Sequence, residues 1–298
     1  MGDSASRSNP VGVIGIGLMG AALTERLLDG GYSVVVHNRT RDKAAPLVAR
    51  GAKWSDNPLA ECERVVISLY STDVVESVLR PMERSLRPGL ILIDTTTGDP
   101  QRMAALGAYF AERGVQYLET PISGSSEQTR RRLSTALAAG PREAFIACQD
   151  LLECLAAKTF YVGAWGNGVR MKLVTNLVLG LNRAVLAEGL VFAKAVGLDP
   201  QDALHVLLNS PAYSRTMDAK GPKMVNGDFT PHAKLSQHIK DVELILDEAA
   251  RSGKSLPLSQ LHLQLLERAE AEGFGELDNS VIINAIDENL ISPFTSPG

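Results

Sequence analysis

The stretch VGVIGIGLMG at residues 11–20 decides how the first half of the chain folds. Its apolar start predicts a strand, and from Leu18 the apolar residues recur at helical spacing until Gly30 and Gly31 end the pattern. Between them stands G-x-G-x-x-G, whose glycines permit a tight turn and close approach of a pyrophosphate to the backbone. A packing turn is the alternative. The strand–turn–helix context favours a cofactor turn made by Gly15, Ile16, Gly17, Leu18, Met19 and Gly20.

Outside this stretch, short apolar runs alternate with helical patterns as far as residue 161. We expect strands at residues 11–17, 32–38, 64–70, 90–94 and 115–120, and helices at 18–29, 43–50, 74–86 and 101–113. Buried strands that alternate with helices are typical of βαβ units, in which helices cover both faces of a parallel sheet. The first half is therefore predicted to be an α/β, Rossmann-like domain with a parallel sheet.

From residue 169 onward the spacing of the apolar residues is helical almost throughout. The longest segment is 169–196, and further helices are expected at 200–208, 234–252 and 258–272. The predicted organisation is a disordered leader (1–10), a dinucleotide-binding domain (11–165) and an all-α domain for substrate binding and dimerisation (166–298). Because the long helix is apolar over much of its circumference and one small bundle would not cover it all, we expect a homodimer.

Composition and charge argue against several classes of protein. A net charge of −4 does not suit a nucleic-acid binder that neutralises phosphates. The most apolar stretch contains Arg183, Glu188 and Lys194, which would be costly in lipid, so no membrane span is expected. The polar N-terminus lacks the apolar run of a signal peptide. The three cysteines have no metal-ligand spacing, which favours free thiols, a cytoplasmic location and no metal site.

The end of the second expected strand bears on the choice between NAD and NADP. An acidic residue there would bond the ribose 2′-hydroxyl of NAD, but the chain has HNRTR at 37–41. Arg39 can stack on adenine and pair with a 2′-phosphate, and Thr40 can donate to the same phosphate. Together with the neighbouring Asn38, these residues favour NADP as the cofactor, with NAD as the alternative. A solvated turn is the structural alternative.

Several motifs in this order resemble the β-hydroxyacid dehydrogenase family, which includes 3-hydroxyisobutyrate dehydrogenase, tartronate semialdehyde reductase and glyoxylate/succinic semialdehyde reductases. The motifs are GIGLMG (15–20), HNRT (37–40), IDTTTGDP (93–100), TPISG (120–124), GNGVRMKLVTN (166–176) and KD (240–241). The resemblance extends from about residue 11 to residue 289. It implies a Rossmann-like domain followed by a helical domain that often forms dimers or tetramers.

The resemblance also implies roles for individual residues. Lys172 matches the catalytic lysine of the family. The positions that match substrate-binding residues are Ser123, Gly124, Asn176 and Lys240. Those that match cofactor-binding residues, in addition to the glycine turn and the segment 38–40, are Leu69, Tyr70, Thr97, Lys240 and its motif neighbour Asp241.

The residues themselves allow a physical interpretation of Lys172. Lys172 and Asn176 stand at i and i+4, so they lie on one face of the long helix, one turn apart. The positive end of the helix dipole and partial burial both favour the neutral amine, which suits a group that exchanges a proton with a hydroxyl or carbonyl oxygen. A lysine that lays its stem over apolar neighbours is the alternative. For Asn176, Ser123 and the Lys240–Asp241 pair, the alternatives are a packing amide, a turn serine and a solvated pair.

Two departures from the family pattern lie near the expected substrate site. Arg130, Arg131 and Arg132 replace small residues, and Thr175 replaces the first of two adjacent asparagines. The arginines could bind an anion, but such a run is more often a solvated face. Both changes bear on the identity of the substrate more than on the reaction.

The predicted function is that of an NAD(P)-dependent oxidoreductase that interconverts a small anionic 3-hydroxy acid and its semialdehyde by hydride transfer. Lys172 would serve as the general acid/base. An imine reductase-like enzyme is one alternative, although such proteins usually lack the lysine. A decarboxylase like 6-phosphogluconate dehydrogenase would need a longer helical domain. A non-catalytic NAD(P)-binding scaffold is the alternative outside enzymology, and the presence of Lys172 argues against it.

Overall fold

The computed structural model describes residues 9–287. The chain divides into two compact units, Met1–Lys172 and Leu173–Gly298. The boundary between them falls inside one long helix, a few residues beyond the position expected at 165. Most of the expected leader, residues 1–8, lies outside the described residues, as do residues 288–298.

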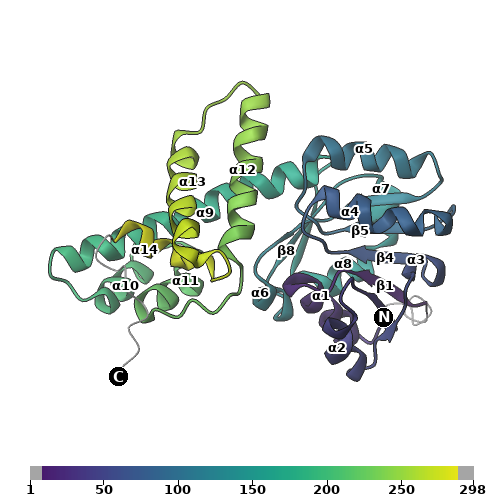
Figure 1. Cartoon of the computed structure of the whole chain (residues 1–298), viewed down its shortest axis with the longest axis horizontal. Coiled ribbons are helices and arrows are strands. Elements are labelled where there is room, and N and C mark those ends of the chain that lie inside the picture. Colours follow the sequence, from purple (N-terminus) through teal and green to yellow (C-terminus); the bar gives the residue numbers. More distant parts are fainter. Residues whose placement is uncertain (1–8, 288–298) are drawn as a thin grey trace. The chain divides into compact units, whose positions relative to one another are not determined.

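The first unit contains a parallel sheet of six strands in the order β3-β2-β1-β4-β5-β6. Three of its strands, β1, β4 and β5, are labelled in Figure 1. The strands are β1 (Val11–Ile14), β2 (Val34–His37), β3 (Lys53–Trp54), β4 (Arg64–Ile67), β5 (Ile91–Asp94) and β6 (Gln116–Glu119). This confirms the predicted Rossmann-like sheet. The strand order reverses between β1 and β4, and ligands of such sheets bind outside the carboxyl ends of the strands at this point.

Three of the helices that follow these strands are shorter than the sequence predicts. The helices are α1 (Leu18–Asp29), α2 (Ala45–Ala49), α3 (Pro58–Glu61), α4 (Thr72–Leu79) and α5 (Pro100–Ala111). The helix expected at 74–86 divides into α4 and a 3₁₀ segment, Arg80–Ser85, because Pro81 lacks the N–H that would continue the α-helical ladder. The core of the sheet comes from fully buried residues of the central strands, among them Val13, Val36, Val66 and Ile93.

The first unit also contains a second sheet, of three strands, that was not predicted from the sequence. It consists of β7 (Ile122–Ser123), β8 (Thr135–Ala138) and β9 (Lys158–Tyr161), with β7 antiparallel and β9 parallel to β8. Three helices accompany it: α6 (Ser126–Arg130), α7 (Arg142–Ala147) and α8 (Gln149–Leu155). Both α6 and α8 pack on α1, so this sheet is part of the first unit's core.

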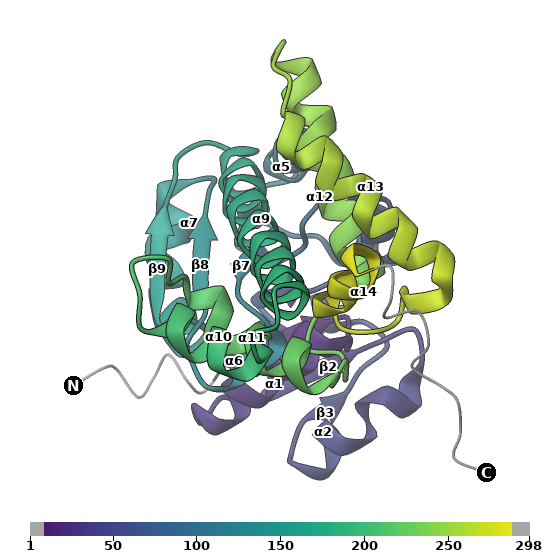
Figure 2. The same ribbon diagram turned by 90° about the vertical axis from the view of Figure 1, so that its left-hand side faces the viewer.

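The second unit is helical, as the sequence predicts. The long helix α9 (Asn167–Ala195) enters it from the first unit, and the other helices are α10 (Pro200–Leu208), α11 (Arg215–Asn226), α12 (Leu235–Arg251), α13 (Pro257–Ala269) and α14 (Ile282–Ile286). Figure 2 shows α12 and α13 packed side by side. The helix α11 was not predicted from the sequence, because it is predominantly polar and has Pro222 in its interior.

The inner face of α9 packs on the other helices of the second unit. Leu186 and Leu190 lie in its apolar core together with Val242 of α12 and Leu266 of α13. At Gly180 an added Cβ would lie 2.7 Å from the ring of His262 and 2.8 Å from that of His238, so only glycine fits. By length and composition alone α9 could also cross a membrane, although 39% of its most apolar window is buried within the protein.

Candidate cofactor and active site

The glycine turn after β1 lies at the point where the strand order reverses. Gly15 has a φ of +99°, and a Cβ there would lie 2.2 Å from the carbonyl oxygen of Ser68 after β4. A Cβ on Gly20 would lie 1.8 Å from the carbonyl oxygen of Gly15. These two glycines are therefore required by the packing of the chain itself.

Gly17 differs from Gly15 and Gly20, because a Cβ built there would meet no atom of the protein within 4 Å. Gly17 is also the N-cap of α1 and offers no side chain to bond the first N–H groups of the helix. The turn thus presents backbone donors and the positive end of a helix toward open space. This arrangement fits the pyrophosphate of a dinucleotide and is not explained by packing alone. Of the other turn residues, Ile16 is buried, Met19 is partly buried and Leu18 is exposed.

Asn38 joins the glycine turn to the end of β2. Its Oδ1 accepts a hydrogen bond from the N–H of Ile16 at 2.9 Å, and its Nδ2 donates to the carbonyl oxygen of Thr40 at 2.8 Å. The two segments expected to bind the cofactor are therefore connected through one side chain. Arg39 and Thr40 are exposed, as a residue that meets the 2′-phosphate of NADP would be.

The ends of β4 and β5 lie beside the same turn. The N–H of Leu69 donates to Oγ1 of Thr96 at 3.2 Å, and the side chain of Leu69 approaches Gly15. Thr97 is the next residue after Thr96 and is partly buried, whereas Tyr70 is exposed. The structure therefore brings the glycine turn, Leu69 and the turn that carries Thr97 to one edge of the sheet.

Two buried carboxyl groups support this edge, and the sequence analysis did not identify either as functional. Asp94 accepts hydrogen bonds from the N–H of Thr96 at 2.9 Å and from the hydroxyl of Tyr117 at 2.8 Å. Burial raises the pKa of Asp94 to about 6 and that of Glu119 to about 7, because an ionised carboxylate is poorly solvated there. Each pKa shift is partly offset by hydrogen bonds to the carboxylate.

Glu119 caps the helix that carries Lys172. Its carboxylate accepts hydrogen bonds from the N–H of Gly166 and, at 3.3 Å, from the N–H of Val169, in the first turn of α9. Lys172 lies in the second turn, and Asn176 follows it at i+4, about 6 Å further along the helix axis.

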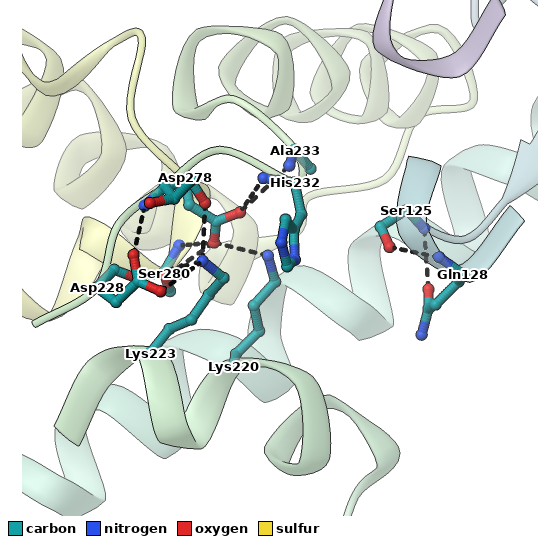
Figure 3. A network of polar contacts seen from close by, with 10 residues as sticks. Ser125, Gln128, Lys220, Lys223, Asp228, His232, Ala233, Asp278 and Ser280 are labelled. Carbon is teal, nitrogen blue, oxygen red and sulfur yellow. Dashed lines mark hydrogen bonds and ion pairs between the residues drawn. The ribbon is translucent and has the colours of Figure 1, made fainter. Parts of the chain in front are cut away.

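Ser123 and Gly124 lie where β7 leads into α6. Gly124 has a φ of +147°, and a Cβ there would lie 2.9 Å from Cβ of Ser134. The next residue, Ser125, forms a capping box with Gln128, in which each side chain bonds the backbone N–H of the other (Figure 3). The capping box fixes the direction in which the chain leaves Ser123 and Gly124.

Two of the three arginines that follow have contacts within the first unit itself. Nε of Arg130 lies 2.8 Å from the carboxylate of Glu25 on α1, and Nε of Arg132 donates to the carbonyl oxygen of Ala156 at 3.4 Å. Arg131 is exposed. An ion pair that connects α6 to α1 accounts for Arg130 without a bound anion.

In the second unit, Asp241 connects the remaining candidate residues. Its Oδ2 accepts a hydrogen bond from Nδ2 of Asn176 at 2.8 Å, and its Oδ1 lies 3.4 Å from Nζ of Lys240. The side chains of Lys240 and Asp241 are 14% and 10% exposed, so this is not a solvated pair. Among residues 9–287 there is no group of three or more His, Cys, Asp or Glu side chains that could hold a metal ion.

Comparison with known proteins agrees with this geometry. Residues 10–163 match the family described as the NAD binding domain of 6-phosphogluconate dehydrogenase. Residues 166–286 match the family described as NAD-binding of NADP-dependent 3-hydroxyisobutyrate dehydrogenase. The first match alone spans more than half of the chain.

Individual relatives cover nearly the whole chain. Glyoxylate/succinic semialdehyde reductase 2, chloroplastic, of Arabidopsis thaliana is 29% identical over 286 residues, which are 93% of this chain and 79% of the relative. The structure of 3-hydroxyisobutyrate dehydrogenase from Salmonella typhimurium shares the fold, with a TM-score of 0.86 at 24% identity over 93% of this chain and 99% of that one.

A third relative is similar in both sequence and structure. Psf3, solved in complex with NADP+ and 2-OPP, has a TM-score of 0.85 at 28% identity and covers 93% of this chain and 100% of its own. The predicted use of NAD or NADP is thereby confirmed. With both family matches in chain order on a Rossmann-like unit and a helical unit, the chain belongs to the β-hydroxyacid dehydrogenase family of NAD(P)-dependent oxidoreductases.

Proposed function

We propose that the protein interconverts a small 3-hydroxy acid, or a related hydroxy acid, and its semialdehyde, with Lys172 as the general acid/base. The observation that carries this proposal is the arrangement on α9. Lys172 stands one helical turn before Asn176, and Asn176 is held in place by the buried carboxylate of Asp241. A proton-exchanging amine and an oriented amide at this spacing suit one small oxygen-bearing substrate.

The cofactor supplies the hydride chemistry, and the residues of the chain bind and orient. The donors at Gly17 and Leu18 would hold the pyrophosphate, and Leu69 and Thr97 would border the nicotinamide. Arg39 and Thr40 support a preference for NADP, because a guanidinium and a hydroxyl are good partners for a 2′-phosphate. Tyr70, Lys240 and Asp241 complete the set of proposed cofactor contacts.

The substrate would be held by its carboxylate at Ser123 and Gly124, with Asn176 and Lys240 as further contacts. Lys172 would then take the proton from the substrate hydroxyl during oxidation, or return it to the carbonyl oxygen during reduction. The name of the Arabidopsis relative, a glyoxylate/succinic semialdehyde reductase, supports aldehyde acids as the class of substrate.

The test is a spectrophotometric assay of the full chain with small hydroxy acids and aldehyde acids, each with NAD(H) and NADP(H), beside Lys172→Ala. We expect turnover in the wild type, a loss of about 10³-fold or more in kcat for the variant, and unchanged cofactor binding in both. Turnover only on imines would favour an imine reductase. Cofactor binding without turnover on any substrate would favour a non-catalytic scaffold.

We also propose that α9 forms the interface of a homodimer or homotetramer. Three apolar side chains stand seven residues apart on α9, and therefore on one face of it, and remain more than half exposed: Val178, Val185 and Phe192. A mass measurement in solution tests this, since Val185→Glu or Phe192→Glu should shift an oligomer toward the monomer. The buried free thiols of Cys62 and Cys148 support a cytoplasmic location.

A further inference from the structure

Glu119 lies at the carboxyl end of β6, is completely buried, and has no place in the reaction proposed above. We propose that Glu119 is a positioning residue for Lys172: its carboxylate holds the first turn of α9 and thereby sets where the lysine amine stands. The inference rests on the proposed function, because it assigns Glu119 a part in the action of Lys172.

The contact is specific to the start of the helix. The carboxylate accepts hydrogen bonds from Gly166 and Val169, whose N–H groups have no acceptor within the helix. At Gly168 an added Cβ would lie 3.0 Å from Oε2 of Glu119 and 3.0 Å from the carbonyl oxygen of Leu137. The glycine therefore admits the carboxylate to the helix terminus, where an anion is also favoured by the helix dipole.

Glu119 is itself fixed by its backbone. Its N–H donates to the carbonyl oxygen of Ala139 and its carbonyl oxygen accepts from the N–H of Ala139, both at 2.9 Å. A second attachment lies one residue before Gly166, where Nε1 of Trp165 donates to the carbonyl oxygen of Tyr117 at 2.8 Å. The entry into α9 is therefore held at two points by the last residues of one strand.

A small displacement of the first turn of α9 would also displace Lys172. Lys172 follows Val169 by three residues, about 4.5 Å along the helix axis, so nothing but one stiff turn separates the anchored amide from the amine. A misplacement of about 1 Å in a reacting group can cost about 100-fold in rate. An anchored first turn is therefore a means of holding the amine at reacting distance.

An amide cannot replace the carboxylate here. The two oxygens of Glu119 face N–H donors of α9, so the NH₂ group of a glutamine would oppose one of those donors. At pH 8, above the pKa of about 7 of Glu119, the isosteric Glu119→Gln thus breaks one bond and removes the negative charge without leaving a cavity. Glu112→Gln, at an exposed position beyond α5, is the matched control.

The experiment compares the full-length wild type, Glu119→Gln and Glu112→Gln in steady-state kinetics and in hydrogen exchange. For Glu119→Gln we expect kcat to fall about 10- to 100-fold, while the Kd of NADPH stays within about twofold. A larger primary deuterium isotope effect and faster exchange of the amides at 166–170 should accompany the loss. Glu112→Gln should match the wild type in all four measurements.

Full kcat in Glu119→Gln would overturn the proposal, and so would an equal loss of NADPH binding, since that indicates general damage. If Glu119→Gln does not fold, Gly168→Ala displaces the carboxylate while leaving Glu119 in the chain, and the same loss of kcat is expected. A wild type without turnover would refute the proposed function instead. The exchange of the 166–170 amides would then still decide whether Glu119 holds α9.

Discussion

Asp94 and Glu119 are register partners at the carboxyl ends of the parallel strands β5 and β6, and both side chains are completely buried. Asp94 supports the turn that leads to Thr97, and Glu119 supports the start of α9. Two neighbouring strand ends thus carry two buried acids with different hydrogen-bond partners. Asp94 bonds the backbone of the turn before Thr97, and Glu119 bonds the backbone at the start of α9.

The first prediction concerns the pH dependence of stability. The pKa values of Asp94 and Glu119 are about 6 and 7 in the folded state and about 4 when unfolded. Between about pH 4 and 7 the folded protein therefore binds more protons, so the contribution of these groups to stability falls as pH rises through this window. Tyr117, which also faces Asp94, stays protonated there because burial raises its pKa well above 10.

Denaturant unfolding at pH 5 and pH 8 measures this effect. The wild type should lose more free energy of unfolding between the two pH values than Asp94→Asn does, by roughly 1–3 kcal/mol. Equal losses in the two proteins would show that Asp94 does not titrate in this range.

The second prediction concerns Arg183 in the second unit. Its side chain is buried, and Nε and Nη1 have no hydrogen-bond partner within residues 9–287. The nearby Asp278 does not accept a hydrogen bond from Arg183, because it is already paired with Lys220. Its two oxygens accept from Nζ of Lys220, from Ser280 and from the N–H groups of His232 and Ala233 (Figure 3).

A buried guanidinium with two nitrogens that lack hydrogen-bond acceptors costs more than an apolar side chain of similar size. Arg183→Met should therefore raise the free energy of unfolding, by about 1–3 kcal/mol. Lys194→Met, on the same helix at a half-exposed position, should change it by less than about 1 kcal/mol. A clear loss of stability in Arg183→Met would mean that the guanidinium has favourable contacts.

Substitution of Lys220 should lower the free energy of unfolding, in contrast to substitution of Arg183. Its Nζ lies 2.7 Å from Oδ1 of Asp278, and both side chains are buried. Lys220→Met leaves that carboxylate buried without its cation, so the free energy of unfolding should fall by about 3–5 kcal/mol. A loss as small as that of an exposed ion pair would contradict this.

Two glycines of the turn should differ in their effects, since Gly17 is expected to matter for cofactor binding and Gly20 for folding. Gly17→Ala adds a Cβ toward open space, so the melting temperature should stay nearly constant while the Kd for NADPH rises about tenfold or more. Gly20→Ala drives a Cβ into the carbonyl of Gly15, so the melting temperature itself should fall. Calorimetry and cofactor titration of both variants check this, and normal NADPH affinity in Gly17→Ala would argue against the pyrophosphate site.

Arg39 should set the choice of cofactor. Arg39→Asp replaces the partner of a 2′-phosphate with an acceptor for a ribose hydroxyl, so the ratio of kcat/KM for NADPH over NADH should fall about 10- to 100-fold. Arg41→Asp should change the ratio less, because the guanidinium of Arg41 lies over the ring of Trp54, 5.2 Å from its centroid. An unchanged ratio in Arg39→Asp would refute the proposed NADP preference.

Local signals in the sequence predicted the elements that depend on them. The bounds of α1 and α10 agree with the prediction because a glycine turn and an Asp199–Pro200 start mark them within the sequence itself. The strand β7 has only two residues, and β8 (TALA) and β9 (KTFY) lack the runs of Val and Ile that mark β1, β2 and β4. Their pairing depends on contacts between distant segments.

In the candidate site too, residues in local motifs were predicted from the sequence, and contacts between distant segments were not. The glycine turn, Arg39 and the spacing of Lys172 and Asn176 are visible in the sequence, since their geometry is local. The role of Glu119 depends on a partner 47 residues away, and nothing in its surroundings along the chain distinguishes it from a strand-end acid. Asp241 likewise acquires its contact with Asn176 only through folding.

The course of α9 has a consequence for the geometry of the reacting groups. Lys172 is the last residue of one unit and Asn176 belongs to the other, yet both stand on the same uninterrupted helix. The separation of the Lys172 and Asn176 backbones, about 6 Å along the helix axis, is therefore fixed by the α-helical hydrogen bonds of α9 and by no loop or hinge.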